Sequence, residues 1–307
     1  MRVGCNTIRV ALDEPNKRTL EETIIGIKEA GFESVDLGLG PVEEEDWFLF
    51  ADDWERRVDE LGELAAKLGI IYSQLHIPFA SGGDNAKDKR FRQPGFLERF
   101  EEGTRLAYLA GARLGIPWAV AHPTSPGEIA GDVEACMRAN HEFYDRFVEL
   151  GIQHGIGTAF ENMIRNTHTP NGLKVRYCAD YEELIEFVDS YNDPMVQICL
   201  DTGHANISGL NLADTVHAMG SRLKVVHFND NFVVGDHHVA PLTGTIDWKR
   251  LIRAMADVGY EGVLNLEIGG YLKRATREMQ KHLMKAAYVS GDYLRQMFYA
   301  AQGKNEG

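Results

Sequence analysis

Residues 196–230 read V-Q-I-C-L-D-T-G-H-A-N-I-S-G-L-N-L-A-D-T-V-H-A-M-G-S-R-L-K-V-V-H-F-N-D. Two short apolar runs, Val196–Asp201 and Leu223–Phe228, flank a helix-like stretch at Leu212–Met219. A strand, a helix and a second strand in this order favour parallel pairing of the two strands. Each run carries a polar residue at its end, Asp201 in the first and His227 in the second.

The same alternation of strand and helix continues along the whole chain. We expect strands at Val3–Asn6, Ser34–Leu39, Ile70–His76, Trp118–His122, Gly157–Glu161, Val196–Asp201, Leu223–Phe228 and Gly262–Glu267. We expect helices at Thr19–Ala30, Trp54–Leu68, Phe96–Leu114, Val133–His154, Tyr181–Tyr191, Leu212–Met219, Trp248–Val258 and Thr276–Phe298. Glycine directly follows several of these helices, which is a C-cap signal. The pattern predicts an α/β fold, a single (β/α)8 TIM barrel in which residues 1–307 form one domain with a frayed C-terminus.

Composition limits the function classes. The net charge of −14 argues against a nucleic-acid partner, because phosphate binding needs a basic footprint. No apolar run approaches the roughly 20 residues of a membrane span, and the N-terminus lacks the apolar segment of a signal peptide. We therefore expect a soluble, cytoplasmic protein without a membrane partner. The four cysteines lack metal-site spacing, and we expect them to be buried thiols.

Polar residues at the strand ends are the informative feature of the sequence. In a barrel, the C-terminal ends of all strands converge on one pocket. Carboxylates crowded there repel one another unless a cation is present, and mixed histidine and carboxylate ligands suit Mn²⁺, Zn²⁺, Co²⁺, Fe²⁺ or Mg²⁺. A divalent metal is therefore the expected cofactor. The residues at or just after these ends are His76, His122, Glu161, Asp201, His204, His227, Asp236, His238 and Glu267.

These motifs resemble the xylose-isomerase-like TIM barrels, a superfamily of sugar and sugar-phosphate isomerases and epimerases that also includes endonuclease IV. The resemblance lies in F-E-N, C-L-D-T-G-H, V-V-H-F-N-D, D-H-H-V-A-P-L-T-G-T-I-D-W and L-N-L-E. It extends from the first strand to Glu267. One departure lies in the loop after the seventh strand, where the family usually has P-G-x-G and this chain has Leu242 in place of the first glycine.

The resemblance implies a metal-dependent isomerase or epimerase of a sugar or a sugar-like polyol. In the family's ketose 3-epimerases, one metal is held by residues that match Glu161, Asp201, His227 and Glu267. The resemblance makes Glu161 and Glu267 the catalytic pair that moves a proton through an enediolate, with His204 donating to a substrate oxygen. We expect the substrate-binding residues to be His76, His122, Asn162 and His238.

Endonuclease IV is the alternative, because its three-zinc site uses nine ligands and this chain has a matching residue type at each. In that case His76, His122, His204, Asp236 and His238 are further metal ligands. The acidic chain and the acidic loop after the second strand favour the sugar enzyme. A dehydratase on the same scaffold and a sugar-binding barrel without turnover also stay open, as does association into a homo-oligomer.

Overall fold

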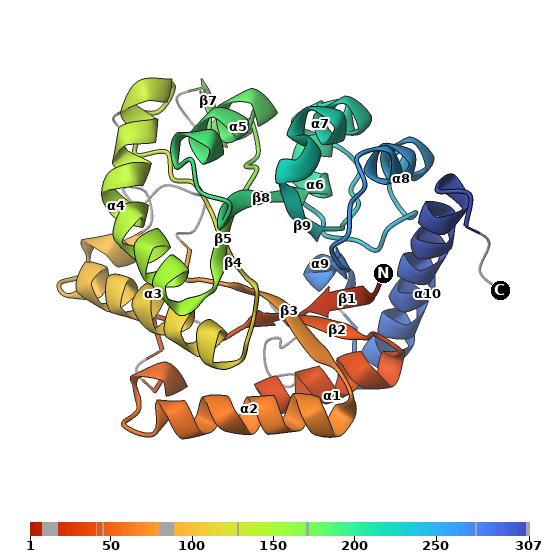
Figure 1. The fold of residues 1–307 in the computed structure, drawn as a ribbon, viewed down its shortest axis with the longest axis horizontal. Helices are drawn as coiled ribbons and strands as arrows, with labels where there is room; N and C mark the ends of the chain where they lie inside the picture. The colour runs from red at the N-terminus through yellow and green to blue at the C-terminus, as the bar shows by residue number, and fades with distance from the viewer. Residues whose placement is uncertain are drawn as a thin grey trace. The chain divides into compact units, whose positions relative to one another are not determined.

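The computed structural model describes residues 1–7, 18–40, 42–44, 46–79, 89–127, 129–169, 172–273 and 275–304, drawn as a ribbon in Figure 1. The chain forms two compact units. The first comprises Met1–Gly38, Leu64–Ser73 and Cys199–Gly307, and the second comprises Leu39–Glu63 and Gln74–Ile198. The expectation that residues 1–307 act as one domain stays a prediction.

The first unit is built around parallel strands that alternate with helices along the chain. Its elements are β1 (Val3–Asn6), α1 (Leu20–Ala30), β2 (Ser34–Gly38), α6 (Thr202–Ile207), α7 (Leu212–Met219), η4 (Gly220–Arg222), β9 (Leu223–His227), α8 (Trp248–Asp257), β10 (Leu264–Leu266), α9 (Gly269–Leu272) and α10 (Arg277–Ala301).

Strand β1 pairs in parallel with both β10 and β2, so that Asn6 lies opposite Asp36. Next to β10, the end of β9 continues the pairing, because Phe228 N–H donates to Asn265 O at 2.7 Å. Parallel pairing places the C-terminal ends of β1, β2, β9 and β10 at the same edge of the unit. The polar residues at these ends are therefore brought together by the sheet itself.

Helices α1 and α10 pack against each other at the outside of this sheet. Helix α1 begins with a capping box, in which Thr19 accepts from the Glu22 backbone and Glu22 accepts from the Thr19 backbone. It ends at Gly31, whose φ of 114° suits glycine. A Cβ at Gly31 would lie 2.9 Å from the ring of Tyr288 on α10, so the close packing of the two helices also requires glycine there.

The second unit has the same strand-and-helix alternation. Its elements are η1 (Phe48–Phe50), η3 (Lys89–Arg92), α3 (Phe96–Arg113), β4 (Trp118–Ala121), α4 (Val133–His154), β5 (Gly157–Glu161), β6 (Asn166–Thr169), β7 (Gly172–Val175) and α5 (Tyr181–Ser190). Three further elements have residues in both units: α2 (Trp54–Leu68), β3 (Ile71–His76) and β8 (Val196–Asp201).

In the second unit, β4 lies between the end of β3 and β5, and both pairings are parallel. Helices α3 and α4 pack against each other beside these strands. Phe160 of β5 is fully buried between Tyr144 of α4 and Phe187 of α5, with ring centroids 5.2 and 4.7 Å away. The aromatic core thereby fixes β5, whose last residue is Glu161, against the helices.

All eight predicted strands and all eight predicted helices are present in the described structure, with ends that differ by a few residues. The antiparallel hairpin β6–β7 and the short helices α6 and α9 were not predicted. The four cysteines are buried, as predicted. In the described part of the chain, no helix has the length and apolar character needed to cross a membrane.

Asn140 of α4 fixes the loop that directly follows β4 and contains His122. Its side-chain oxygen accepts from Thr124 N–H, and its amide nitrogen donates to Thr124 O and Cys136 O, each at 2.8 Å. Asn140→Ala removes the side-chain partners of the buried Thr124 N–H and C=O, which costs about 1–3 kcal/mol for each group, whereas Cys136 O keeps its helical bond. We expect the free energy of unfolding, measured by urea denaturation, to fall by about 2–4 kcal/mol. Gln153→Ala, at an exposed position of the same helix, should change it by less than about 0.5 kcal/mol; equal effects would contradict this role.

Candidate functional site

Three residues of the first unit form the centre of the candidate site. Asp201 ends β8, His227 ends β9 and Glu267 directly follows β10. Each offers a ligand atom, and these atoms lie within 4.8 Å of one another. Asp201 and His227 are fully buried, whereas 13% of the Glu267 side chain is exposed. Two carboxylates and one imidazole at this spacing form a donor set that suits a divalent metal.

The Asp201 carboxylate is oriented by two hydrogen bonds. Its Oδ1 accepts from the His204 backbone N–H at 2.7 Å, because Asp201 is the N-cap of α6. Its Oδ2 accepts from the side-chain amide of Asn229 at 2.8 Å. A carboxylate suits an N-cap because it satisfies a backbone N–H that has no partner within the helix. The start of α6 therefore fixes Asp201 and places His204 one turn away.

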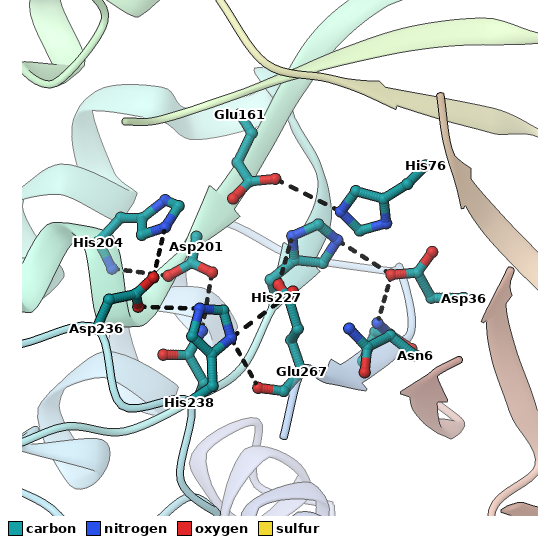
Figure 2. Close-up of polar contacts among 12 residues, drawn as sticks. Asn6, Asp36, His76, Glu161, Asp201, His204, His227, Asp236, His238 and Glu267 are labelled. Atoms are coloured by element: carbon teal, nitrogen blue, oxygen red, sulfur yellow. Dashed lines mark hydrogen bonds and ion pairs between the residues drawn. The ribbon is translucent and has the colours of Figure 1, made fainter. Parts of the chain in front are cut away.

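His227 lies between two carboxylates of the first unit, as Figure 2 shows. Its Nδ1 is 3.4 Å from Glu267 Oε2, and its Nε2 is 3.3 Å from Asp36 Oδ2. The Asp36 carboxylate also accepts from the Asn265 side-chain amide at 3.3 Å. Asp36 is fully buried in the middle of β2.

A second group in the first unit consists of His204, Asp236 and His238 (Figure 2). Asp236 Oδ1 lies 2.9 Å from His238 Nε2, and Asp236 Oδ2 lies 3.8 Å from His204 Nε2. Burial raises the pKa of Asp236, but the hydrogen bonds to both histidines outweigh burial and hold that pKa well below its usual range. Burial lowers the pKa of His238, yet the Glu267 and Asp236 carboxylates raise it to about 9. His238 is therefore an imidazolium at neutral pH.

The loop that carries Asp236 and His238 is anchored by another buried carboxylate, that of Asp230. Asp230 accepts backbone N–H bonds from Asn231, Thr245 and Ile246 through one oxygen, and the indole N–H of Trp248 at 2.8 Å through the other. These donors satisfy a carboxylate that is fully removed from water. Asp230 thereby ties both ends of the loop together.

The same loop explains the departure from the family's glycine pattern. Leu242, at the position of the first glycine, has a φ of 71° and thus keeps the left-handed conformation that glycine adopts readily. Its side chain is 45% exposed, so it meets no crowding there. At Gly244, in contrast, a Cβ would lie 2.3 Å from Asp230 Oδ1, so this glycine is required by close contact.

The second unit contributes a third group, His76, His122 and Glu161, whose ligand atoms also lie within 4.8 Å of one another. His122 Nε2 lies 3.0 Å from Glu161 Oε2, and His76 Nε2 lies 3.8 Å from the same oxygen. The Phe79 ring lies tilted against the His122 ring, with centroids 4.5 Å apart and planes 31° apart. Asn162 follows Glu161 and is buried. The predicted polar residues at the ends of β3, β4 and β5 therefore lie close together, as expected for parallel strands.

The structure thus brings together the predicted residues within each unit, while their catalytic, binding and ligand roles stay predictions. Sequence reasoning missed several buried polar residues that surround them. These are Asn6, Asp36, Asn229, Asp230 and Asn265, all of them fully buried. For Asp36 a signal was present, because a carboxylate inside the run S-V-D-L-G is unusual in a buried strand.

Comparisons with known proteins place the chain in a family. Residues 26–286 match the model of the xylose isomerase-like TIM barrel family. A D-psicose 3-epimerase from Enterocloster bolteae is 34% identical over 86 residues, which are 28% of this chain and 27% of that protein. A probable endonuclease 4 from Mesomycoplasma hyopneumoniae is 32% identical over 79 residues, which are 23% of this chain and 29% of that protein. Each match therefore spans less than a third of the relative's length.

The fold is also similar to solved structures over nearly the full length. A D-allulose 3-epimerase from Methylomonas sp., solved in complex with D-allulose, has a TM-score of 0.70 and 17% identity, and the match covers 97% of both chains. At this identity the likeness concerns the fold. The family match over most of the sequence shows that the chain belongs to the xylose isomerase-like TIM barrels and confirms the predicted α/β fold class.

Proposed function

We propose that this protein is a divalent-metal-dependent sugar epimerase that acts on a free ketose. The donor set Asp201, His227 and Glu267, buried within 4.8 Å in one unit, is the observation that carries the proposal. Relatives named as a D-psicose 3-epimerase and an L-ribulose 3-epimerase support a sugar substrate, and so does a D-allulose complex of a protein with the same fold. Glu161, at the end of β5, is proposed as the fourth ligand, from its place in the family motif.

The residues present fit a divalent metal. Burying Asp201 and Glu267 close together costs free energy, because like charges repel and water is excluded. A divalent cation offsets this repulsion, and Mn²⁺, Zn²⁺, Co²⁺ and Mg²⁺ accept such ligands. When bound, the metal supplies Lewis-acid polarisation of the substrate's carbonyl and neighbouring hydroxyl oxygens.

The chain's own glutamates carry the proton transfer in this proposal. One of Glu161 and Glu267 removes the proton from the carbon next to the carbonyl, and the electron pair moves onto the carbonyl oxygen to give an enediolate. The other glutamate returns a proton to the opposite face of the same carbon, which inverts its configuration. His122, 3.0 Å from Glu161, can hold that carboxylate in place through a hydrogen bond.

The group His204, Asp236 and His238 supplies hydrogen-bond donors for the substrate. In the metal-free protein, the Glu267 and Asp236 carboxylates raise the pKa of His238 to about 9, and its Nδ1 lies 3.6 Å from Glu267 Oε1. A cationic donor stabilises negative charge that develops on a substrate oxygen. Asp236 fixes the orientation of His238 and His204, and we propose that both imidazoles contact substrate hydroxyls. His76 and Asn162 are proposed to complete the sugar-binding pocket.

A zinc phosphodiesterase of the endonuclease IV type is the second candidate. It is favoured by the three groups described above, each of which has three residues that could bind a metal, and by the relatives named as probable endonuclease 4. Two observations disfavour it. The net charge of −14 gives no general phosphate footprint. A basic segment follows β3 and contains Lys87, Lys89, Arg90 and Arg92. Arg90 forms an ion pair with Glu43 at 2.7 Å, and Lys87 lies outside the described residues. The two functions differ in the number of metals bound.

The paired glutamates give the first test of the proposal. Glu161→Gln and Glu267→Gln remove the proton acceptors without a large change in shape, and we expect each to lower kcat/KM by at least about 10²-fold. The measurement is ketose epimerisation over a panel of free ketohexoses and ketopentoses, together with exchange of the substrate C–H proton with solvent. Glu134→Gln, whose side chain is 90% exposed on α4, is the control and should keep wild-type activity. Full activity in either site variant would overturn the assigned roles.

His238 gives a test that needs no substrate. Its pKa of about 9 in the folded, metal-free protein exceeds the value of about 6.5 for a free imidazole. Its stabilising contribution is therefore complete below about pH 6.5 and is lost as the pH rises through about 9. In chelator-treated protein, we expect the free energy of unfolding of the wild type to fall over this range more than that of His238→Gln.

NMR titration of the His238 ring should give the same pKa, and Asp236→Asn should shift it down toward the ordinary value. His217→Gln is the control for the unfolding series, because the His217 side chain is 50% exposed on α7. A His238 ring that titrates near pH 6.5 in the metal-free protein would contradict this assignment.

A further inference from the structure

Asp36 is a buried carboxylate to which the family motif gives no role. It lies in the middle of β2, opposite Asn6 of β1, and is fully buried. An ionised carboxylate in such a position is costly unless hydrogen bonds or a nearby cationic or polar group compensate it. Its contacts within the first unit show what provides this compensation.

Two side chains of the first unit meet one oxygen of Asp36, and one of them, His227, is labelled in Figure 2. His227 Nε2 lies 3.3 Å from Asp36 Oδ2, and the Asn265 amide nitrogen donates to the same oxygen at 3.3 Å. The opposite ring nitrogen of His227, Nδ1, faces Glu267 at 3.4 Å. Asp36 and Glu267 thus lie on the two sides of one imidazole.

We propose that Asp36 is a positioning residue that prepares His227 for the metal, an inference that rests on the proposed metal site. A carboxylate beside Nε2 accepts its hydrogen and fixes the tautomer with the proton on Nε2. The lone pair of Nδ1 is then directed toward Glu267 and Asp201, where a metal would be bound. The hydrogen bond to Asp36 also makes the imidazole a stronger ligand and fixes the plane of its ring.

Asn265 is the support for Asp36. Its amide oxygen has no hydrogen-bond partner among the described residues, whereas its amide nitrogen donates to Asp36, so the amide is oriented by the carboxylate. A Cβ at Gly4 would lie 2.7 Å from the Asn265 oxygen, so β1 has no side chain where Asn265 packs. Asn265 therefore packs closely against Gly4 of β1, and its amide nitrogen donates to the Asp36 oxygen that faces His227.

The test is the metal affinity of the purified protein, measured for Mn²⁺ and Zn²⁺ by competition with a chelator. We expect Asp36→Asn to weaken affinity by about 10–100-fold. Asn265→Ala, which removes only the support, should weaken it less than Asp36→Asn does. Ser34→Ala is the matched control, because Ser34 is also polar, fully buried and on β2 but bonds to Ser73, and it should leave the affinity unchanged.

A structural role alone would not change the tautomer of His227. Long-range ¹⁵N–¹H NMR of the folded protein should show the proton on Nε2 in the wild type and a mixture of both tautomers in Asp36→Asn. If Asp36→Asn does not fold, Asn265→Ala carries both measurements. Unchanged affinity and tautomer in the folded variants would overturn the inference. A wild-type protein that binds no metal would instead overturn the proposed function, so the two failures are distinguishable.

Discussion

The burial of negative charge at the C-terminal ends of the strands is the constraint on which the site depends. In the first unit, Asp36, Asp201 and Asp230 are fully buried, and Glu267 is nearly so. Each of the three aspartates has hydrogen-bond donors. Asp36 contacts Asn265 and His227, and Asp201 accepts from Asn229 and from the first turn of α6. Asp230 accepts from loop backbone N–H groups and from Trp248. A divalent cation would neutralise the negative charge of the Asp201 and Glu267 carboxylates beside His227.

The hydrogen-bond partners distinguish a carboxylate that holds a loop from those that we propose as metal ligands. Asp230 has four donors and serves the loop, whereas Asp201 and Glu267 keep oxygen atoms near the His227 ring. The anchored loop then brings Asp236 and His238 beside them. The parallel strands bring their C-terminal ends together, and the loop after β9 contributes His238, which we propose as a hydrogen-bond donor to the substrate. Substrate choice can therefore vary through the loops while the buried carboxylates stay in place.

Much of the fold could be predicted because its signals are local. The strands β1, β5 and β8 and the helices α2, α4 and α7 have the predicted ends, since apolar runs, polar N-caps and C-terminal glycines mark them. The hairpin β6–β7 lacks an alternating apolar pattern and was missed. Asp201, His227 and Glu267 could be predicted because they stand where an apolar run stops. Asp36 shows one local signal, a carboxylate inside a buried strand, but its contact with His227 could not be predicted. The two residues are distant in sequence, and only the pairing of β1 with β2 and β10 brings them together.

The number of metal ions per chain is the most direct test of the proposed epimerase function. The sugar epimerase and the phosphodiesterase would share the residues around His227, but only the phosphodiesterase would use the surrounding histidines as metal ligands. Elemental analysis of the purified protein, combined with a metal-loaded crystal structure, measures both the count and the ligands. We expect one divalent ion per chain, bound by Glu161, Asp201, His227 and Glu267, with His76, His122, His204 and His238 free of metal. Three ions, with those histidines as ligands, or no ion at all, would contradict it.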